Sequence, residues 1–229
     1  MNGCRPFTKE EYDKIILSVN ENHKYSKRNA CFITVGIYTG FRISEILSLR
    51  VKQIYAPSGK IQPTISVEAK NMKAKKGRSV DVSPILHGVL KIYWKHLQDV
   101  KKTNPNDYIF YSQKPLSDGT TNHPIKMRQA YYIITETCDE LGILGKIGTH
   151  SLRKTYAKNS LRLAEGDIHL LQKLMGHAKI DSTMHYIEVH AEKLHDIMKN
   201  QGFKEEEKIV EDAKKKIEQE LFEENVDLT

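Results

Sequence analysis

The sequence predicts a mainly α-helical fold with a small antiparallel β-sheet, an α+β domain. Apolar residues recur at three- and four-residue intervals along most of the 229-residue chain, which is the helical period. Two short runs rich in Ile, Val and Thr, 61–67 and 78–82, flank a lysine-rich stretch, and this pattern is typical of a β-hairpin. With 39% hydrophobic residues, the chain can bury one sizeable core.

The first three helices have clear starts. Thr8 and Glu11 make a capping-box sequence that opens a helix with apolar side chains on one face, at Tyr12, Ile15, Ile16 and Val19. A second helix is predicted over 27–38. After Gly40, a third helix opens at Arg42, and its buried stripe is formed by Ile43, Ile46, Leu47 and Leu49.

The second half of the chain continues this helical pattern. Ser83 and Pro84 begin a helix whose apolar positions are Ile85, Leu86, Val89, Leu90, Tyr93 and Leu97. Tyr108 to Tyr111 is predicted to be a short buried strand, between loops at 104–107 and 117–122. Helix is then predicted over 125–141, and Thr149 is predicted to cap a helix that begins a helical region extending past residue 186.

Charge is distributed unevenly along the sequence. The net charge is +7, but residues 204–229 contain five lysines against ten acidic residues, so residues 1–203 carry thirty-one basic against nineteen acidic groups, or +12. A cationic body of this kind suits a polyanion, with an affinity that falls as salt rises. The sequence has three scattered cysteines, no apolar signal region and no apolar run of eighteen residues. These features indicate a reduced intracellular protein with no membrane partner.

A spaced set of polar residues indicates phosphate chemistry. The set consists of two arginines, two histidines and a tyrosine: Arg42, His150, Arg153, His177 and Tyr186. Arginine offers the forked donors that phosphate oxygens accept, and histidine hydrogen-bonds a phosphate or helps a tyrosine hydroxyl to ionise. His150 and Arg153 lie three residues apart near a helix N-terminus, where phosphate binds readily. Glu45, one turn beyond Arg42, is expected to orient it. Together these residues predict a metal-free site for attack on a phosphodiester.

These residues carry a family resemblance. Thr-Gly-x-Arg-x-x-Glu at 39–45, His-x-Leu-Arg at 150–153, Leu-x-Gly-His at 174–177 and Tyr186 together resemble the tyrosine recombinase (phage integrase) family, over 5–189. The resemblance implies the tyrosine recombinase catalytic-domain fold and a site-specific recombinase that cleaves and rejoins DNA without a cofactor. It implies that Tyr186 forms a 3′-phosphotyrosyl bond and releases a 5′-hydroxyl. The four other residues of the set would bind the phosphate.

The resemblance also implies a general acid in the hairpin. Family members use a hairpin lysine to protonate the leaving 5′-oxygen, and this lysine usually precedes an arginine of the second strand by five residues. Lys73 stands at this interval before Arg78. The register of a hairpin is weakly defined by sequence, so Lys70, Lys75 and Lys76 remain alternatives.

The expected organisation is a catalytic domain over 1–202 and an amphipathic helical tail over 203–229, which acts on a neighbouring subunit or folds back on its own. Forty-one residues precede Arg42, too few for the DNA-binding domain with which most relatives clamp the duplex. Either this is an excised catalytic domain or a naturally short recombinase. The spacing of His185, His190 and His195 does not suggest a metal site, so no metal is expected.

The expected partners are double-stranded DNA carrying recombination sites, further copies of the chain in a tetramer on that DNA, and accessory DNA-bending proteins. The expected location is the cytoplasm, in association with the nucleoid. Two alternative functions remain open, a tyrosine-type DNA topoisomerase and a non-catalytic DNA-binding regulator of the same fold. The sequence leaves the DNA site open, as well as the choice among integration, excision, inversion and dimer resolution.

Overall fold

The computed structural model describes residues 3–18, 26–68, 77–100, 103–112, 114–177 and 183. All of them belong to a compact unit, Met1–Ile187, and a second unit comprises Glu188–Thr229. Lys73, Tyr186 and the predicted tail at 203–229 lie outside the described residues. Within the described ranges, no helix is both long and apolar enough to cross a bilayer.

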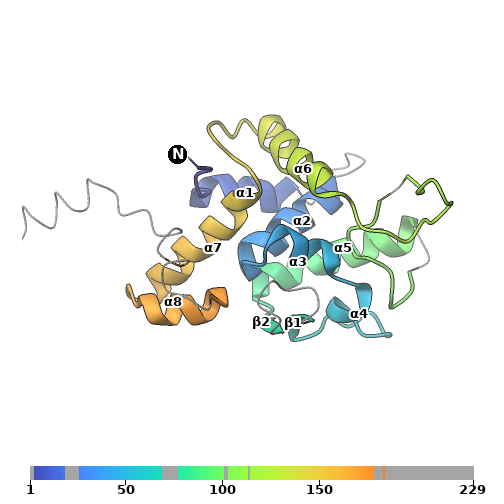
Figure 1. The fold of residues 1–229 in the computed structure, drawn as a ribbon, viewed down its shortest axis with the longest axis horizontal. Helices are drawn as coiled ribbons and strands as arrows, with labels where there is room; N and C mark the ends of the chain where they lie inside the picture. The colour runs from blue at the N-terminus through green and yellow to red at the C-terminus, as the bar shows by residue number, and fades with distance from the viewer. Residues whose placement is uncertain are drawn as a thin grey trace, which may run out of the picture. The chain divides into compact units, whose positions relative to one another are not determined.

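The described part of the first unit is mostly helical and contains one two-stranded antiparallel sheet, as the sequence predicts (Figure 1). In chain order, its elements are α1 (Lys9–Leu17), α2 (Ser26–Thr39), α3 (Ile43–Ser48), α4 (Val51–Ile54), β1 (Thr64–Val67), β2 (Arg78–Asp81), α5 (Pro84–Val100), α6 (Met127–Glu140), α7 (Thr149–Leu163) and α8 (Ile168–Met175).

Helix α2 is the centre of the core. Most of its residues are buried, and α1, α5, α6 and α7 all pack against it. After its polar first turn, residues 30–37 are buried on every side, and a helix of this kind is stable only when other elements surround it, which explains its central place. Its side chain Phe32 makes an edge contact with Phe110, 5.1 Å between ring centroids, and this contact brings the 108–111 segment into the same core.

Local sequence signals explain the ends and faces of several elements. Thr8 and Glu11 form the predicted capping box at the start of α1. The antiparallel pairing of β1 and β2 places Ile65 opposite Val80. Ile65 and Val67 are buried while the residues between and before them are more exposed, which is the alternation of a strand with one face on the core.

Four details differ from the sequence-based expectation. The prediction of a strand at 108–111 was wrong, because this segment makes only isolated bridges at its two ends, although Ile109 and Phe110 between them are fully buried. Ile85 is 47% exposed, because it lies on the outer side of the first turn of α5. Gly148 rather than Thr149 is the N-cap of α7, where its N–H donates to Ser151 Oγ. The short helix α4 was not predicted.

Candidate active site

The site is built around the turn that follows α2. Gly40 has a φ of +59°, a conformation that favours glycine, and a β-carbon there would lie 2.3 Å from Cδ1 of Tyr156 on α7. At Gly36, one turn earlier, a β-carbon would lie 2.5 Å from Cδ1 of Leu152. These two glycines therefore let α7 approach α2 closely, and this approach brings Arg153 to the Gly40 turn.

Arg153 joins three segments that are far apart in the sequence. Its guanidinium donates to the carbonyl oxygen of Gly40 through Nη1, and through Nη2 to the carbonyl oxygen of Met175 at 2.7 Å and to Nε2 of His177 at 2.8 Å. The side chain is 2% exposed. A guanidinium held by several acceptors in a low-dielectric environment is a preorganised positive charge, as the binding of a phosphate requires.

His177 reaches Arg153 because α8 ends at Gly176. Gly176 has a φ of +63° and reverses the chain, so that the His177 N–H donates back to Gln172 O. Burial, and after it the positive charges of Arg153, Arg42 and Arg78, together lower the pKa of His177 to about 4. His177 is therefore neutral at pH 7, and its second ring nitrogen, Nδ1, lies 2.9 Å from Oγ1 of Thr183.

Arg42 is the N-cap of α3, and Glu45 orients it as expected from the sequence. The guanidinium donates to Glu45 Oε1 at 2.9 Å, and the backbone N–H of Arg42 donates to Oε2 at 2.8 Å. The Glu45 side chain is 1% exposed while that of Arg42 is 33% exposed. The buried carboxylate thus fixes a cation that remains accessible to solvent, and this cation lies near enough to His177 to affect its pKa.

Arg78 on β2 is a site residue that sequence reasoning did not identify as functional. It donates to the carbonyl oxygens of Thr39 at 2.6 Å and Gly40 at 3.4 Å, and its guanidinium carbon lies 5.1 Å from the ring centre of Phe41. The strand thereby fixes the same turn that α7 contacts. In the sequence, Arg78 served only to locate Lys73 five residues before it. Its acceptors are backbone carbonyl oxygens almost forty residues away, and a motif spacing cannot predict such contacts.

The predicted set is therefore brought together in part. Arg42, Arg153 and His177 gather at the Gly40 turn, and His150 lies in the first turn of α7, exposed to solvent and one turn before Arg153. Lys73 and its alternatives Lys70, Lys75 and Lys76 lie outside the described residues, as does Tyr186, so their roles stay predictions. Among the described residues, no group of His, Cys, Asp or Glu side chains is arranged to hold a metal ion.

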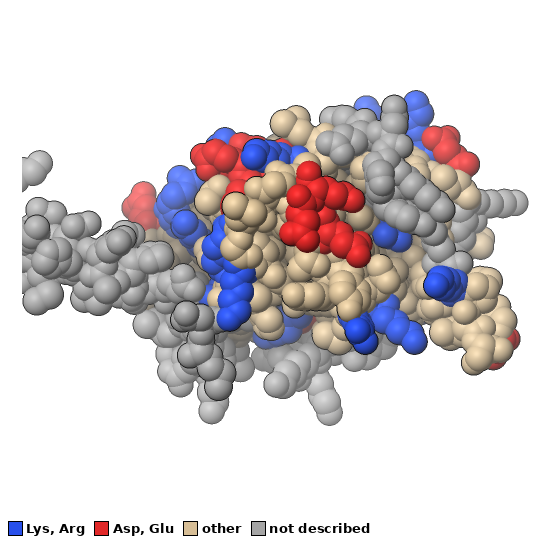
Figure 2. Space-filling view, turned by 90° about the horizontal axis from the view of Figure 1, so that it is seen from above, with Lys and Arg blue, Asp and Glu red and all other residues tan. Residues whose placement is uncertain are grey.

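Charge is distributed unevenly on the face of the molecule that Figure 2 shows. The face in Figure 2 carries a central group of acidic side chains with Lys and Arg around it, so the net positive charge is not spread evenly.

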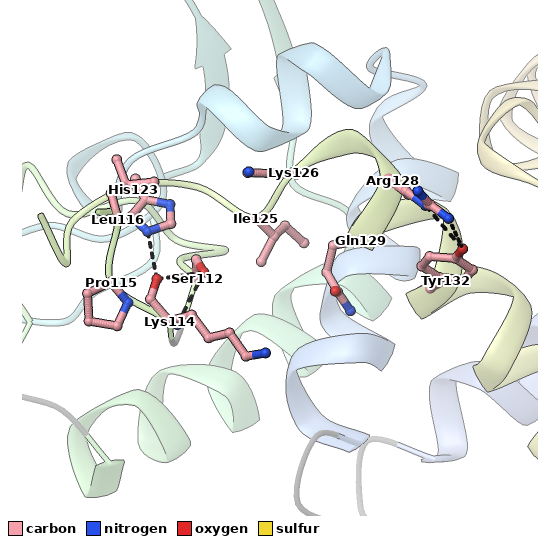
Figure 3. Close-up of a pocket in the computed structure, with 10 residues that line it drawn as sticks. All are labelled: Ser112, Lys114, Pro115, Leu116, His123, Ile125, Lys126, Arg128, Gln129 and Tyr132. Atoms are coloured by element: carbon pink, nitrogen blue, oxygen red, sulfur yellow. Dashed lines mark hydrogen bonds between the residues drawn. The ribbon is translucent and has the colours of Figure 1, made fainter. Parts of the chain in front are cut away.

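A pocket of about 400 Å³ lies between the 112–126 segment and the start of α6, and Lys114, Lys126 and Arg128 line it (Figure 3). Arg128 donates to the hydroxyl of Tyr132 at 3.0 Å. This basic pocket contains none of the predicted site residues.

The fold and this arginine–histidine cluster are those expected for the catalytic domain of a tyrosine recombinase. Comparison with known proteins agrees, since residues 5–193 match the phage integrase family. The chain belongs to this family, and the class predicted from the sequence is confirmed.

Individual relatives show how much of their length the chain covers. It is 33% identical to the probable integrase/recombinase YoeC of Bacillus subtilis over 71% of this chain and 78% of YoeC. It is 29% identical to tyrosine recombinase XerD of Oceanobacillus iheyensis over 83% of this chain and 59% of XerD. It is 27% identical to tyrosine recombinase XerC of Thermodesulfovibrio yellowstonii over 80% of this chain and 57% of XerC. The chain thus spans less than two thirds of these two recombinases.

Solved structures confirm the fold. The crystal structure of XerA recombinase matches 89% of this chain and 67% of XerA with a TM-score of 0.66 at 20% identity. The XerH site-specific recombinase bound to its palindromic difH substrate matches 87% of this chain and 54% of XerH with a TM-score of 0.64 at 22% identity. The predicted tyrosine recombinase catalytic-domain fold is therefore confirmed.

Proposed function

We propose that residues 1–202 form the catalytic domain of a site-specific DNA recombinase that cleaves and rejoins DNA strands through a 3′-phosphotyrosyl intermediate. The observation that carries this proposal is the convergence of Arg42, Arg153 and His177 on one turn from three separate parts of the chain. A cluster of fixed cations with forked donors suits the pentacoordinate phosphorus formed on attack, which carries more negative charge than the starting diester.

In this mechanism the hydroxyl of Tyr186 passes its proton to water as its oxygen attacks the scissile phosphorus. A bond forms between the tyrosine oxygen and phosphorus while the bond from phosphorus to the 5′-oxygen breaks, and Lys73 gives its proton to that leaving oxygen. Arg42 and Arg153 bind the non-bridging oxygens, and His150 and His177 complete the phosphate pocket. Attack by a second strand's 5′-hydroxyl reverses the step, so the phosphodiester bond energy is conserved and no nucleotide cofactor is required.

The partner that this chemistry requires is double-stranded DNA with recombination sites. Solved relatives such as XerH are bound to DNA, and residues 1–203 of this chain have a net charge of +12. The basic pocket at the start of α6 adds cations that suit backbone phosphates. Paired sites require a tetramer on DNA, with the 203–229 segment linking subunits and DNA-bending proteins assisting. The protein would act at the nucleoid.

The proposal is tested with two plasmids that carry the ends of the DNA element encoding this chain. Sequencing of the junctions should reveal reciprocal products with the unaltered protein and none with Tyr186→Phe. Relaxation of supercoils without junctions would support a topoisomerase instead. DNA binding with neither product, unchanged by Tyr186→Phe, would support a non-catalytic regulator.

A further inference from the structure

Three side chains form a continuous hydrogen-bonded row inside the site. Thr183 is fully buried, and its hydroxyl lies 2.9 Å from Nδ1 of His177. The other ring nitrogen, Nε2, lies 2.8 Å from Nη2 of Arg153. Both nitrogens of one imidazole are thereby engaged, with a hydroxyl on one side and a guanidinium on the other.

The chemistry of these groups determines where the proton lies. A guanidinium has donors only, so Nε2 of His177 must accept from Arg153 and carries no proton. Because the ring is neutral at pH 7, its single proton is on Nδ1, and the hydroxyl of Thr183 accepts it. Free neutral imidazole side chains favour the opposite tautomer, with the proton on Nε2. An acceptor at Nδ1 therefore works together with the donor at Nε2 to hold the ring in the form that Arg153 requires.

We propose that Thr183 is a positioning residue, which holds His177 in the Nδ1–H tautomer so that the ring accepts from Arg153 and fixes the guanidinium for the phosphate. This inference rests on the proposed function for its catalytic consequence. In this proposal His177 acts on the phosphate indirectly, by fixing the guanidinium of Arg153. The same hydrogen bond anchors the chain three residues before Tyr186, a stretch that spans at most about 11 Å between α-carbons.

The tautomer is measured directly by nitrogen-15 NMR of the histidine side chains in the full chain, with the His177 signals assigned from a His177→Gln variant. At pH 7.5 His177 should carry its proton on Nδ1 in the unaltered protein and in Thr183→Ser, which keeps the hydroxyl. Thr183→Val, which has nearly the same shape without the hydroxyl, should shift His177 towards the Nε2–H form. An Nε2–H ring in the unaltered protein, or an Nδ1–H ring that persists in Thr183→Val, would overturn the proposal.

The consequence for cleavage is measured as the rate of covalent adduct formation on nicked DNA at saturating protein. Thr183→Val should slow the rate roughly tenfold, as the loss of one well-placed hydrogen bond does, with DNA affinity unchanged. Thr183→Ser should restore most of the rate. Thr137→Val is the matched control, because Thr137 is 4% exposed and its hydroxyl has no hydrogen-bond partner within the described part of the chain. Its rate should equal that of the unaltered protein.

The two readouts keep this inference separate from the proposed function. If the unaltered protein forms no adduct on any site DNA, the proposed function fails, while the tautomer experiment still tests the hydrogen-bonded row. If adducts form but Thr183→Val cleaves at the full rate, the positioning role is contradicted and the recombinase function stands. Equal slowing in Thr183→Val and Thr137→Val would also contradict it, because the effect would then reflect only a perturbed core.

Discussion

Arg78 and Arg153 donate hydrogen bonds to the same acceptor, the carbonyl oxygen of Gly40. One arginine comes from a strand of the hairpin and the other from α7, so a single peptide group joins the sheet, the helix and the turn that leads to Arg42. The geometry of Arg42 and Arg153, which we propose to bind phosphate, therefore depends on groups outside the proposed phosphate contacts.

Removal of Arg78 should loosen this junction. Arg78→Ala leaves the carbonyl oxygen of Thr39 without its charged donor, and hydrogen bonds of this kind contribute about 1.5–3 kcal/mol each. We expect the free energy of unfolding in urea to fall by about 2 kcal/mol. Arg162→Ala, at an exposed position in the last turn of α7, is the control and should change it by less than about 0.5 kcal/mol. Equal effects of the two substitutions would contradict the role given to Arg78.

Glu45 should matter for both stability and cleavage. Glu45→Gln keeps an oxygen for the N–H of Arg42 but removes the charge that holds its guanidinium, and the loss of one charge-assisted hydrogen bond costs about 1.5–3 kcal/mol. The rate of adduct formation should fall at least tenfold, because Arg42 is no longer oriented. Glu136→Gln, an exposed position on α6, serves as the control. The rate is measured by quenching the reaction at a series of times and quantifying the covalent adduct on denaturing gels. An unchanged rate in Glu45→Gln would show that Arg42 is oriented by other groups.

Two glycine substitutions should change the free energy of unfolding in opposite directions. Gly40→Ala forces a left-handed backbone on alanine and places a methyl group against the Tyr156 ring, so we expect destabilisation of at least about 2 kcal/mol. Gly88→Ala, at an exposed position within α5 where a β-carbon meets no atom within 4 Å, should stabilise by about 0.5–1 kcal/mol. Thermal unfolding distinguishes them, and a stable Gly40→Ala would mean that α7 does not approach the turn as described.

Acid should destabilise the fold through His177. Its pKa is about 4 in the folded state against an ordinary value of 6.5, so on acidification the unfolded state takes up a proton first. The free energy of unfolding should therefore fall as the pH drops from about 6.5 to about 4, by at most about 3 kcal/mol from this group. The His177→Gln variant should lack this component. Urea titrations at several pH values measure the difference, and identical pH slopes for the two proteins would exclude a buried neutral His177.

The sequence predicted which residues come together at the Gly40 turn better than it predicted their interactions. Motif spacing identified Arg42, Arg153 and His177, because the family pattern fixes their order, and the capping box fixed the start of α1. Arg78 and Thr183 were not identified as parts of the site, since their contacts are with a backbone carbonyl and a ring nitrogen supplied by the tertiary fold. Ile109 and Phe110 were correctly placed in the core, but their segment was wrongly assigned as a strand. A short apolar run has the same pattern whether it is only buried or also paired in a sheet, so the sequence could not distinguish the two.

The most direct test of the recombinase proposal is a covalent capture experiment. Nicked suicide duplexes spanning the borders of the DNA element that encodes the chain are incubated with the unaltered protein and with Tyr186→Phe, and denaturing gels and peptide mapping follow. We predict a protein–DNA adduct with the unaltered protein alone, attached to Tyr186 through a 3′-phosphate, with a free 5′-hydroxyl on the released strand. An adduct that persists in Tyr186→Phe, or DNA that is bound and never cleaved on any border duplex, would contradict the proposal.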